Sequence, residues 1–102
     1  MTTQRIYRLP EGIATKAEFF AAVIDTFPLD PPLSDERQVW DALSDSLFQG
    51  LMESPDAHIA IIWPDPAMTD AQDFETAANI LRGLVGQLHG SKAASVDIAA
   101  NV

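Results

Sequence analysis

The chain has 102 residues, enough for one modest hydrophobic core, and we expect a single domain that spans residues 1–102. Apolar residues make up 47% of the sequence and charged residues 21%, a balance typical of globular proteins that argues against disorder along the chain. The net charge of −9 opposes direct binding to DNA or RNA, and the lack of cysteine excludes disulfides and a thiol nucleophile.

The sequence contains no signal for a membrane. No apolar run approaches the roughly 18 residues that a membrane-spanning helix needs. The first residues lack the apolar segment of a secretory signal peptide. We therefore expect a cytoplasmic protein.

The acidic side chains are concentrated in the middle of the chain. Residues 30–75 hold 11 of the 15 acidic residues but only one of the six basic ones, Arg37. Such a field attracts cationic proteins and raises their association rate at low salt. The charge pattern therefore predicts a cationic protein as partner.

The first two elements are a strand and a helix. Residues 5–9 are rich in β-forming side chains and nearly alternate in polarity, which predicts a strand. Thr15 and Glu18 form a capping box at the start of a helix that Pro28 ends. The apolar side chains of this helix recur at i,i+4 spacings and are predicted to join the core; they are Phe19, Phe20, Val23, Ile24 and Phe27.

A second helix is expected after the extended, proline-containing linker at residues 29–33. Ser34 or Asp35 is the predicted N-cap, and Pro55 closes the helix. At about 100° per residue, the apolar positions fall within about 120° of arc and are predicted to face the core. This stripe consists of Val39, Trp40, Leu43, Leu47 and Leu51.

Residues 58–63 form a continuous apolar run of strand length, typical of a strand that is covered on both faces in a parallel sheet. A second capping box, Thr69 with Gln72, predicts the start of a third helix, and Gly90 suits the position just after its end. Residues 95–99 have the pattern of a third strand.

Two glycines, Gly83 and Gly86, lie inside the third helix. Each destabilises a helix by roughly 1 kcal/mol relative to alanine, which suggests either close packing or fraying at this point. The complete order is strand, helix, helix, strand, helix, strand. It predicts an α/β fold with a small three-stranded parallel sheet and helices packed around it.

The second helix also has a pair of carboxylates opposite its apolar stripe. Asp41 and Asp45 are one turn apart, with Ser44 beside them and Phe48 nearby. Like charges at this spacing destabilise a helix by roughly 0.2–0.5 kcal/mol. Two interpretations remain open: a surface for a cationic partner, or a solvated face on which Arg37, one turn before Asp41, offsets the repulsion.

Motifs for catalysis and cofactor binding are absent from the sequence. It has no glycine-rich phosphate loop and no G-x-S-x-G nucleophile motif. His58 and His89 lie 31 residues apart, which does not match zinc-ligand spacing. We therefore expect no metal, no cofactor and no enzymatic activity. A small hydrolase using Asp41 and Asp45 as acid and base remains an alternative, and it would require a pocket that separates their pKa values.

The pattern W-D-A-L-x-D-x-L at residues 40–47, placed on the second helix, resembles the barstar family of intracellular ribonuclease inhibitors. The order of elements, a buried strand that ends in Trp63, and the last strand support a barstar-like domain over residues 5–99. The chain departs from the family in the loop before the second helix, which lacks the usual tyrosine and glycine, and at residues 83–90, which lack an acidic side chain.

The resemblance implies a protein that inhibits a ribonuclease by inserting this helix and the preceding loop into its active site, like an antitoxin or immunity protein. The helix carboxylates take the place of substrate phosphate, with Asp45 as the main charge and Asp41 as the supporting one. The expected partner is a cationic ribonuclease or nuclease toxin, and the free protein is expected to be monomeric. The alternative is a drifted domain of this fold that binds a non-nuclease protein. The expected partner-binding residues are Arg37, Gln38, Trp40, Asp41, Ser44, Asp45 and Phe48.

Overall fold

Three strands and three helices follow one another in the order that the sequence predicts. The computed structural model describes residues 4–34 and 38–99. The three strands form one parallel sheet with the helices packed around it, so the predicted α/β fold class is confirmed. The elements are β1 (Gln4–Arg8), α1 (Lys16–Thr26), α2 (Trp40–Glu53), β2 (His58–Trp63), α3 (Ala71–Leu88) and β3 (Ala93–Ile98).

The sheet has the order β1-β2-β3, so β2 is the central strand and the other two are edges. Tyr7 of β1 pairs with Ile61 of β2, which in turn pairs with Val96 of β3. Strand β3 begins at Ala93, two residues before its predicted start. The alanines at this end have little β-propensity, and the pairing with β2 extends the strand over them.

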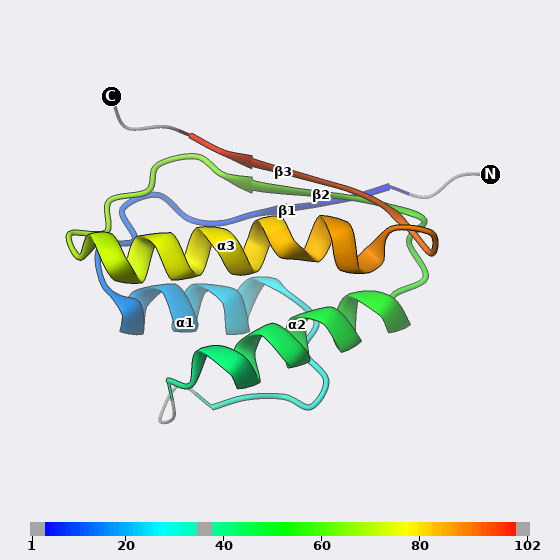
Figure 1. Cartoon of the computed structure of the whole chain (residues 1–102), viewed down its shortest axis with the longest axis horizontal. Coiled ribbons are helices and arrows are strands. Elements are labelled where there is room, and N and C mark those ends of the chain that lie inside the picture. Colours follow the sequence, from blue (N-terminus) through cyan, green and yellow to red (C-terminus); the bar gives the residue numbers. More distant parts are fainter. Residues whose placement is uncertain (1–3, 35–37, 100–102) are drawn as a thin grey trace.

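All three helices lie on the same side of the sheet (Figure 1). The alternate residues Ile59, Ile61 and Trp63 are buried against them. The prediction that this strand is covered on both faces is wrong, because Ile6 on the outer face, next to Ala60, is 57% exposed. The three helices pack together as one group, so none remains to cover the other face.

Aromatic contacts join the sheet to the helices. The Trp63 ring lies 5.1 Å from Phe19 of α1 and 5.5 Å from Phe74 of α3, measured between ring centroids. Tyr7 stacks on Phe27 at 4.8 Å. Burial raises the Tyr7 pKa, against the opposing effect of a hydrogen bond with the Ser54 side chain.

The N-cap predictions succeed for one helix and fail for another. At α1, the Glu18 N–H donates to the Thr15 hydroxyl oxygen at 3.1 Å, as predicted. At α3, the cap is Asp70, whose carboxylate accepts a hydrogen bond from the Asp73 N–H at 2.9 Å. The prediction of Thr69 is wrong because the neighbouring carboxylate caps as strongly and sets the helix start one residue later.

Helix α2 begins later than predicted. It starts at Trp40 after Val39, without a side-chain cap, so Ser34 is not its cap, and Asp35 lies outside the described residues. Val39 is 51% exposed and leaves the predicted core stripe because its backbone is not yet helical. The rest of the stripe is confirmed, with Trp40 half-buried and the remaining members fully buried; these are Leu43, Leu47 and Leu51.

The glycines of α3 are not explained by packing. Gly83 and Gly86 are exposed, and a methyl group on either would meet no other atom within 4 Å. The helix continues past both to Leu88, so neither predicted reason for them holds. Gly90 follows the helix with a φ of +92°, as expected of a residue just beyond a helix end.

Candidate functional site

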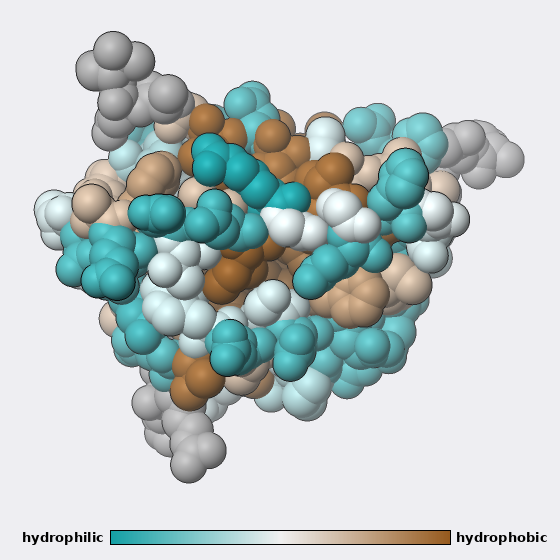
Figure 2. Space-filling view, in the orientation of Figure 1, coloured by the Kyte–Doolittle hydropathy of each residue, from teal (hydrophilic) through white to brown (hydrophobic). Residues whose placement is uncertain are grey.

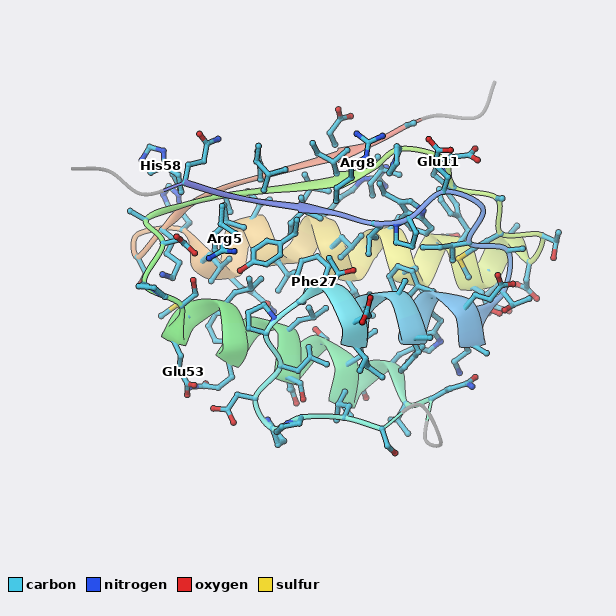
Figure 3. All side chains as sticks on the ribbon, turned by 180° about the vertical axis from the view of Figure 1, so that it is seen from behind. Arg5, Arg8, Glu11, Phe27, Glu53 and His58 are labelled. Carbon is cyan, nitrogen blue, oxygen red and sulfur yellow. The ribbon has the colours of Figure 1, made fainter. Side chains whose placement is uncertain are left out.

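Helix α2 is the element farthest from the sheet, below α1 and α3 in Figure 1 and again in the reverse view of Figure 3. Its inner side is fixed by the buried side chains of Leu43, Leu47 and Leu51. Its outer side faces away from the sheet. In Figure 2 the lower rim of the molecule, where α2 lies, is mostly hydrophilic, and apolar surface gathers nearer the sheet.

Four side chains follow one another along the outer side of α2, each one turn after the last. Asp41, Asp45, Gln49 and Glu53 are all exposed, and we call them the outer ridge. The side chains of Asp41 and Asp45 form no hydrogen bond or ion pair with any residue in 4–34 or 38–99. Arg37, the predicted neighbour of Asp41 and a member of the predicted site, lies outside the described residues. The two carboxylates are therefore available to a partner as far as the described chain is concerned.

The C-terminal end of the outer ridge is engaged within the chain. The Gln49 side-chain amide donates to Glu53 at 3.0 Å, and Glu53 also shares a hydrogen bond with Asp30 of the linker. The hydrogen bond with Glu53 raises the pKa of Asp30, while the bonds from Gln49 and then Asp30 lower the pKa of Glu53. In Figure 3 Glu53 points away from the body of the protein. None of these three residues was predicted to belong to the site, although the four-residue spacing after Asp45 indicates Gln49 and Glu53.

The aromatic members of the predicted site are partly used by the fold. Trp40 is half-buried, its ring 5.0 Å from Phe20, and the Lys16 ammonium lies 5.1 Å from the Trp40 ring centroid. Phe48 is half-buried and packs against the core. Trp40 thus attaches α2 to α1, and only part of Phe48 can contact a partner.

The smaller members of the predicted site lie close to the carboxylates in the sequence. Ser44 is half-buried between Asp41 and Asp45 in the chain, and Gln38 is half-buried two residues before the helix. The described part of the predicted site is therefore one surface of α2 and its N-terminal approach.

The linker holds the other flank of α2. The Asp30 N–H donates to the Ser46 carbonyl at 3.2 Å. Gly50 is buried so closely against the linker that a methyl group at this position would overlap the Pro28 carbonyl. A hollow of about 350 Å³ opens beside Val39 at the start of the helix, between α2 and the linker. Backbone contacts on this flank thus add to the buried side chains of the inner side in fixing the position of the outer ridge.

Most basic side chains elsewhere are occupied. Arg5 faces the Asp56 carboxylate at 3.4 Å, and Arg8 faces Glu11 at 4.0 Å. The Lys92 ammonium donates to the carbonyl oxygens of Ser54 and Asp56, at 2.5 and 2.6 Å. Most of the cations that flank the acidic region in the sequence therefore bind groups elsewhere in the chain, and none of these three forms an ion pair with Asp41 or Asp45.

The described residues contain no group of three or more His, Asp or Glu side chains placed to hold a metal ion. Within the same residues, no helix has both the length and the apolarity to cross a membrane. Comparisons with protein-family models, curated proteins and solved structures found no match.

Proposed function

We propose that this protein is a barstar-like inhibitor, which binds a cationic ribonuclease or nuclease toxin in the cytoplasm and covers its active site. One observation carries the proposal: Asp41 and Asp45 are exposed one turn apart on α2, with no partner in the described chain. The two carboxylates act as mimics of substrate phosphate.

The physical basis is charge complementarity. A site that binds a phosphodiester is lined with Arg, Lys and His donors, and a carboxylate can satisfy them through charge-assisted hydrogen bonds. Asp41 and Asp45 need not break an ion pair with another described residue before they bind such donors. The net charge of −9 accelerates the encounter with a cationic protein.

The remaining site residues have graded roles. Asp45, in the middle of the helix, supplies the main charge, and Asp41 supports it from one turn earlier. Ser44 and the exposed part of Phe48 contact the partner beside them. Trp40 acts indirectly, since its packing on α1 sets the start of α2.

The test is inhibition of barnase, a basic ribonuclease of the type that barstar inhibits, with other basic nucleases assayed in parallel. We expect inhibition that weakens as salt rises, because exposed charges are screened. The Asp45→Ala variant should bind at least about 30-fold more weakly, equivalent to about 2 kcal/mol, the usual threshold for a binding hot spot. Its thermal stability should be unchanged or slightly raised.

Asp25→Ala is the matched control, because Asp25 is exposed on α1 and loses the same charge. This variant should inhibit like the wild type. Equal losses for both variants would show that only the net charge matters. Binding to basic proteins without inhibition of any nuclease would favour the drifted, non-nuclease domain. Hydrolysis that disappears when either Asp is replaced would favour the enzyme alternative.

A further inference from the structure

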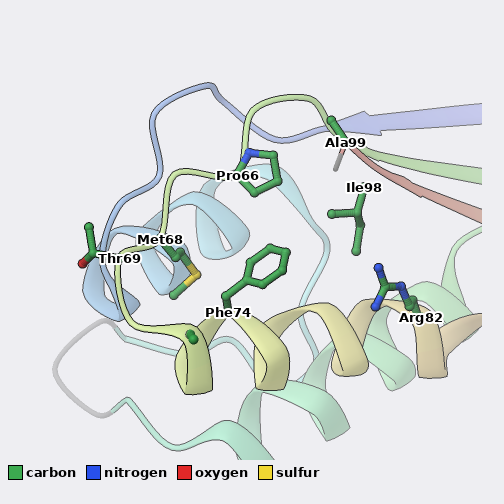
Figure 4. Close-up of a pocket in the computed structure, with 8 residues that line it drawn as sticks. Pro66, Met68, Thr69, Phe74, Arg82, Ile98 and Ala99 are labelled. Atoms are coloured by element: carbon green, nitrogen blue, oxygen red, sulfur yellow. The ribbon is translucent and has the colours of Figure 1, made fainter. Parts of the chain in front are cut away.

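A second concave surface lies on α3, at the carboxyl end of the sheet. The hollow has a volume of about 390 Å³ and lies between α3, the segment that follows β2, and the end of β3 (Figure 4). This volume is within the range of small-molecule pockets, roughly 300–1,000 Å³. Its lining includes Met68, Phe74, Arg82 and Ile98.

The wall of this pocket is mainly apolar and well supported. Phe74, Met68 and Ile98 are half-buried and pack against the core. The Phe74 ring lies 5.5 Å from the buried Trp63 ring, measured between centroids, so the core supports it. The indole N–H of Trp63 is itself buried without a hydrogen-bond partner in the described chain. Phe74, Met68 and Ile98 together offer an apolar surface to a hydrocarbon group.

Arg82 gives the pocket its only cation among the described lining residues. In Figure 4 its guanidinium group points from α3 toward Ile98. The Arg82 side chain forms no ion pair or hydrogen bond with any described residue. In contrast, Arg5, Arg8 and Lys92 have acidic or carbonyl partners. Arg82 is exposed, so its guanidinium group is accessible to a ligand.

We propose that this pocket binds a small organic monocarboxylate with an apolar body. The hydrocarbon portion lies against Phe74 and Met68, and the carboxylate accepts hydrogen bonds from the Arg82 guanidinium, whose planar fork matches a carboxylate. The net charge of −9 repels anions, so the apolar contacts are required and a short anion such as acetate is excluded. None of the lining residues belongs to the outer ridge, so the proposal is independent of nuclease inhibition.

The experiment is calorimetric titration with sodium octanoate, with the indole N–H resonances followed by NMR. We expect one octanoate per chain and a shift of the Trp63 resonance that exceeds that of Trp40, because Trp63 supports Phe74. Arg82→Gln should weaken octanoate binding at least about tenfold, the lower range for a hydrogen bond to a charged group. Arg8→Gln is the control, since Arg8 lies on β1 away from the pocket.

A second measurement does not depend on any variant. Octan-1-ol has a similar hydrocarbon chain without the charge and should bind at least about tenfold more weakly than octanoate. Equal binding of octanol and octanoate, equal losses in the two arginine variants, or binding of several octanoates per chain would each overturn the proposal. Acetate should cause no shift of Trp63, and a shift with acetate would also overturn it.

Discussion

Aspartates in two regions of this protein have opposite environments. Asp56, between α2 and β2, is only 7% exposed and accepts a hydrogen bond from the Ser54 hydroxyl at 3.0 Å. It also faces the Arg5 guanidinium at 3.4 Å. Asp41 and Asp45 belong to the same acidic segment, residues 30–75, but they are exposed and their side chains are unpaired in the described structure. One carboxylate serves the fold, and the other two are not needed by it.

The presence or absence of partners within the chain therefore separates carboxylates that stabilise the fold from those that are candidates for binding. Around Asp56, the Lys92 ammonium donates to two backbone carbonyls and the Arg5 side chain reaches over from β1, so one polar network joins β1 to the segments that precede β2 and β3. Buried polar groups are normally satisfied in this way. Asp41 and Asp45 of the outer ridge have no such partner among the described residues, so they remain available for intermolecular contacts. The variants below test this distinction in order of decreasing effect.

The largest effect should come from the inner flank of α2. Gly50→Ala places a methyl group onto the Pro28 carbonyl and should lower the free energy of unfolding by about 3 kcal/mol, as in other overpacked sites. Urea unfolding would measure the loss. The control is Gly83→Ala on α3, which meets no atom and should raise stability by about 0.5–1 kcal/mol. The same substitution is thus expected to have opposite signs in the two helices, and a gain at Gly50 would contradict this account.

Removal of the engaged carboxylate should have the next largest effect. Asp56→Ala leaves the Ser54 hydroxyl and Arg5 without their acceptor and should lower stability by about 1–2 kcal/mol. Thermal unfolding monitored by circular dichroism would measure it. Asp25→Ala, an exposed site on α1, should change stability by less than about 0.5 kcal/mol. Similar effects at the two sites would remove the distinction between Asp56 and the exposed carboxylates.

An unpaired ridge carboxylate should have a small effect of the opposite sign. Asp45→Asn removes the repulsion from Asp41 one turn away and should raise stability by roughly 0.2–0.5 kcal/mol. The gain should shrink at high salt, which screens exposed charges. A loss of more than about 1 kcal/mol in urea unfolding would assign Asp45 to the fold and contradict its proposed role.

The smallest effect concerns the two carboxylates that share a hydrogen bond. The pKa of Asp30 should lie above its usual value and should fall toward that value in Glu53→Gln, because the hydrogen bond with the Glu53 carboxylate and then its negative charge are both removed. A raised folded-state pKa favours folding at low pH, and this contribution is lost as pH rises through it. The lowered pKa of Glu53 has the opposite dependence, present above the unfolded value and lost as pH falls, so the net change in stability is small. NMR titration of the carboxyl carbons would measure both.

The fold could be predicted because the spacing of apolar residues along the sequence indicates which side chains are buried. The apolar spacing in α1 and α3 and the continuous run of β2 each identify their element without tertiary information. The sequence could not predict that the helices cover only one face of the sheet, since this depends on how the helices pack with one another. The predicted start of α2 is wrong. Serine is a good N-cap by residue type, which favoured Ser34, but the chain reaches helical geometry only at Trp40.

The candidate site was predictable in part for the same reason. Helical periodicity alone places Asp41 and Asp45 opposite the core stripe, and the structure has both exposed. The bond between Asp30 and Glu53 joins residues far apart in the chain and depends on the path of the linker. The pocket around Arg82 combines α3, β3 and the segment after β2, so no local pattern could indicate it.

The backbone contacts between the linker and α2 affect the entropy of association. Pro28 packs closely against Gly50, and the Asp30 N–H donates to the Ser46 carbonyl. These contacts on the middle of the helix are made by backbone atoms, which have no side-chain rotamers to lose. A partner that docks on Asp41 and Asp45 would then immobilise two short side chains on an already rigid support. Interfaces that are ordered before the encounter retain more of their contact energy as affinity.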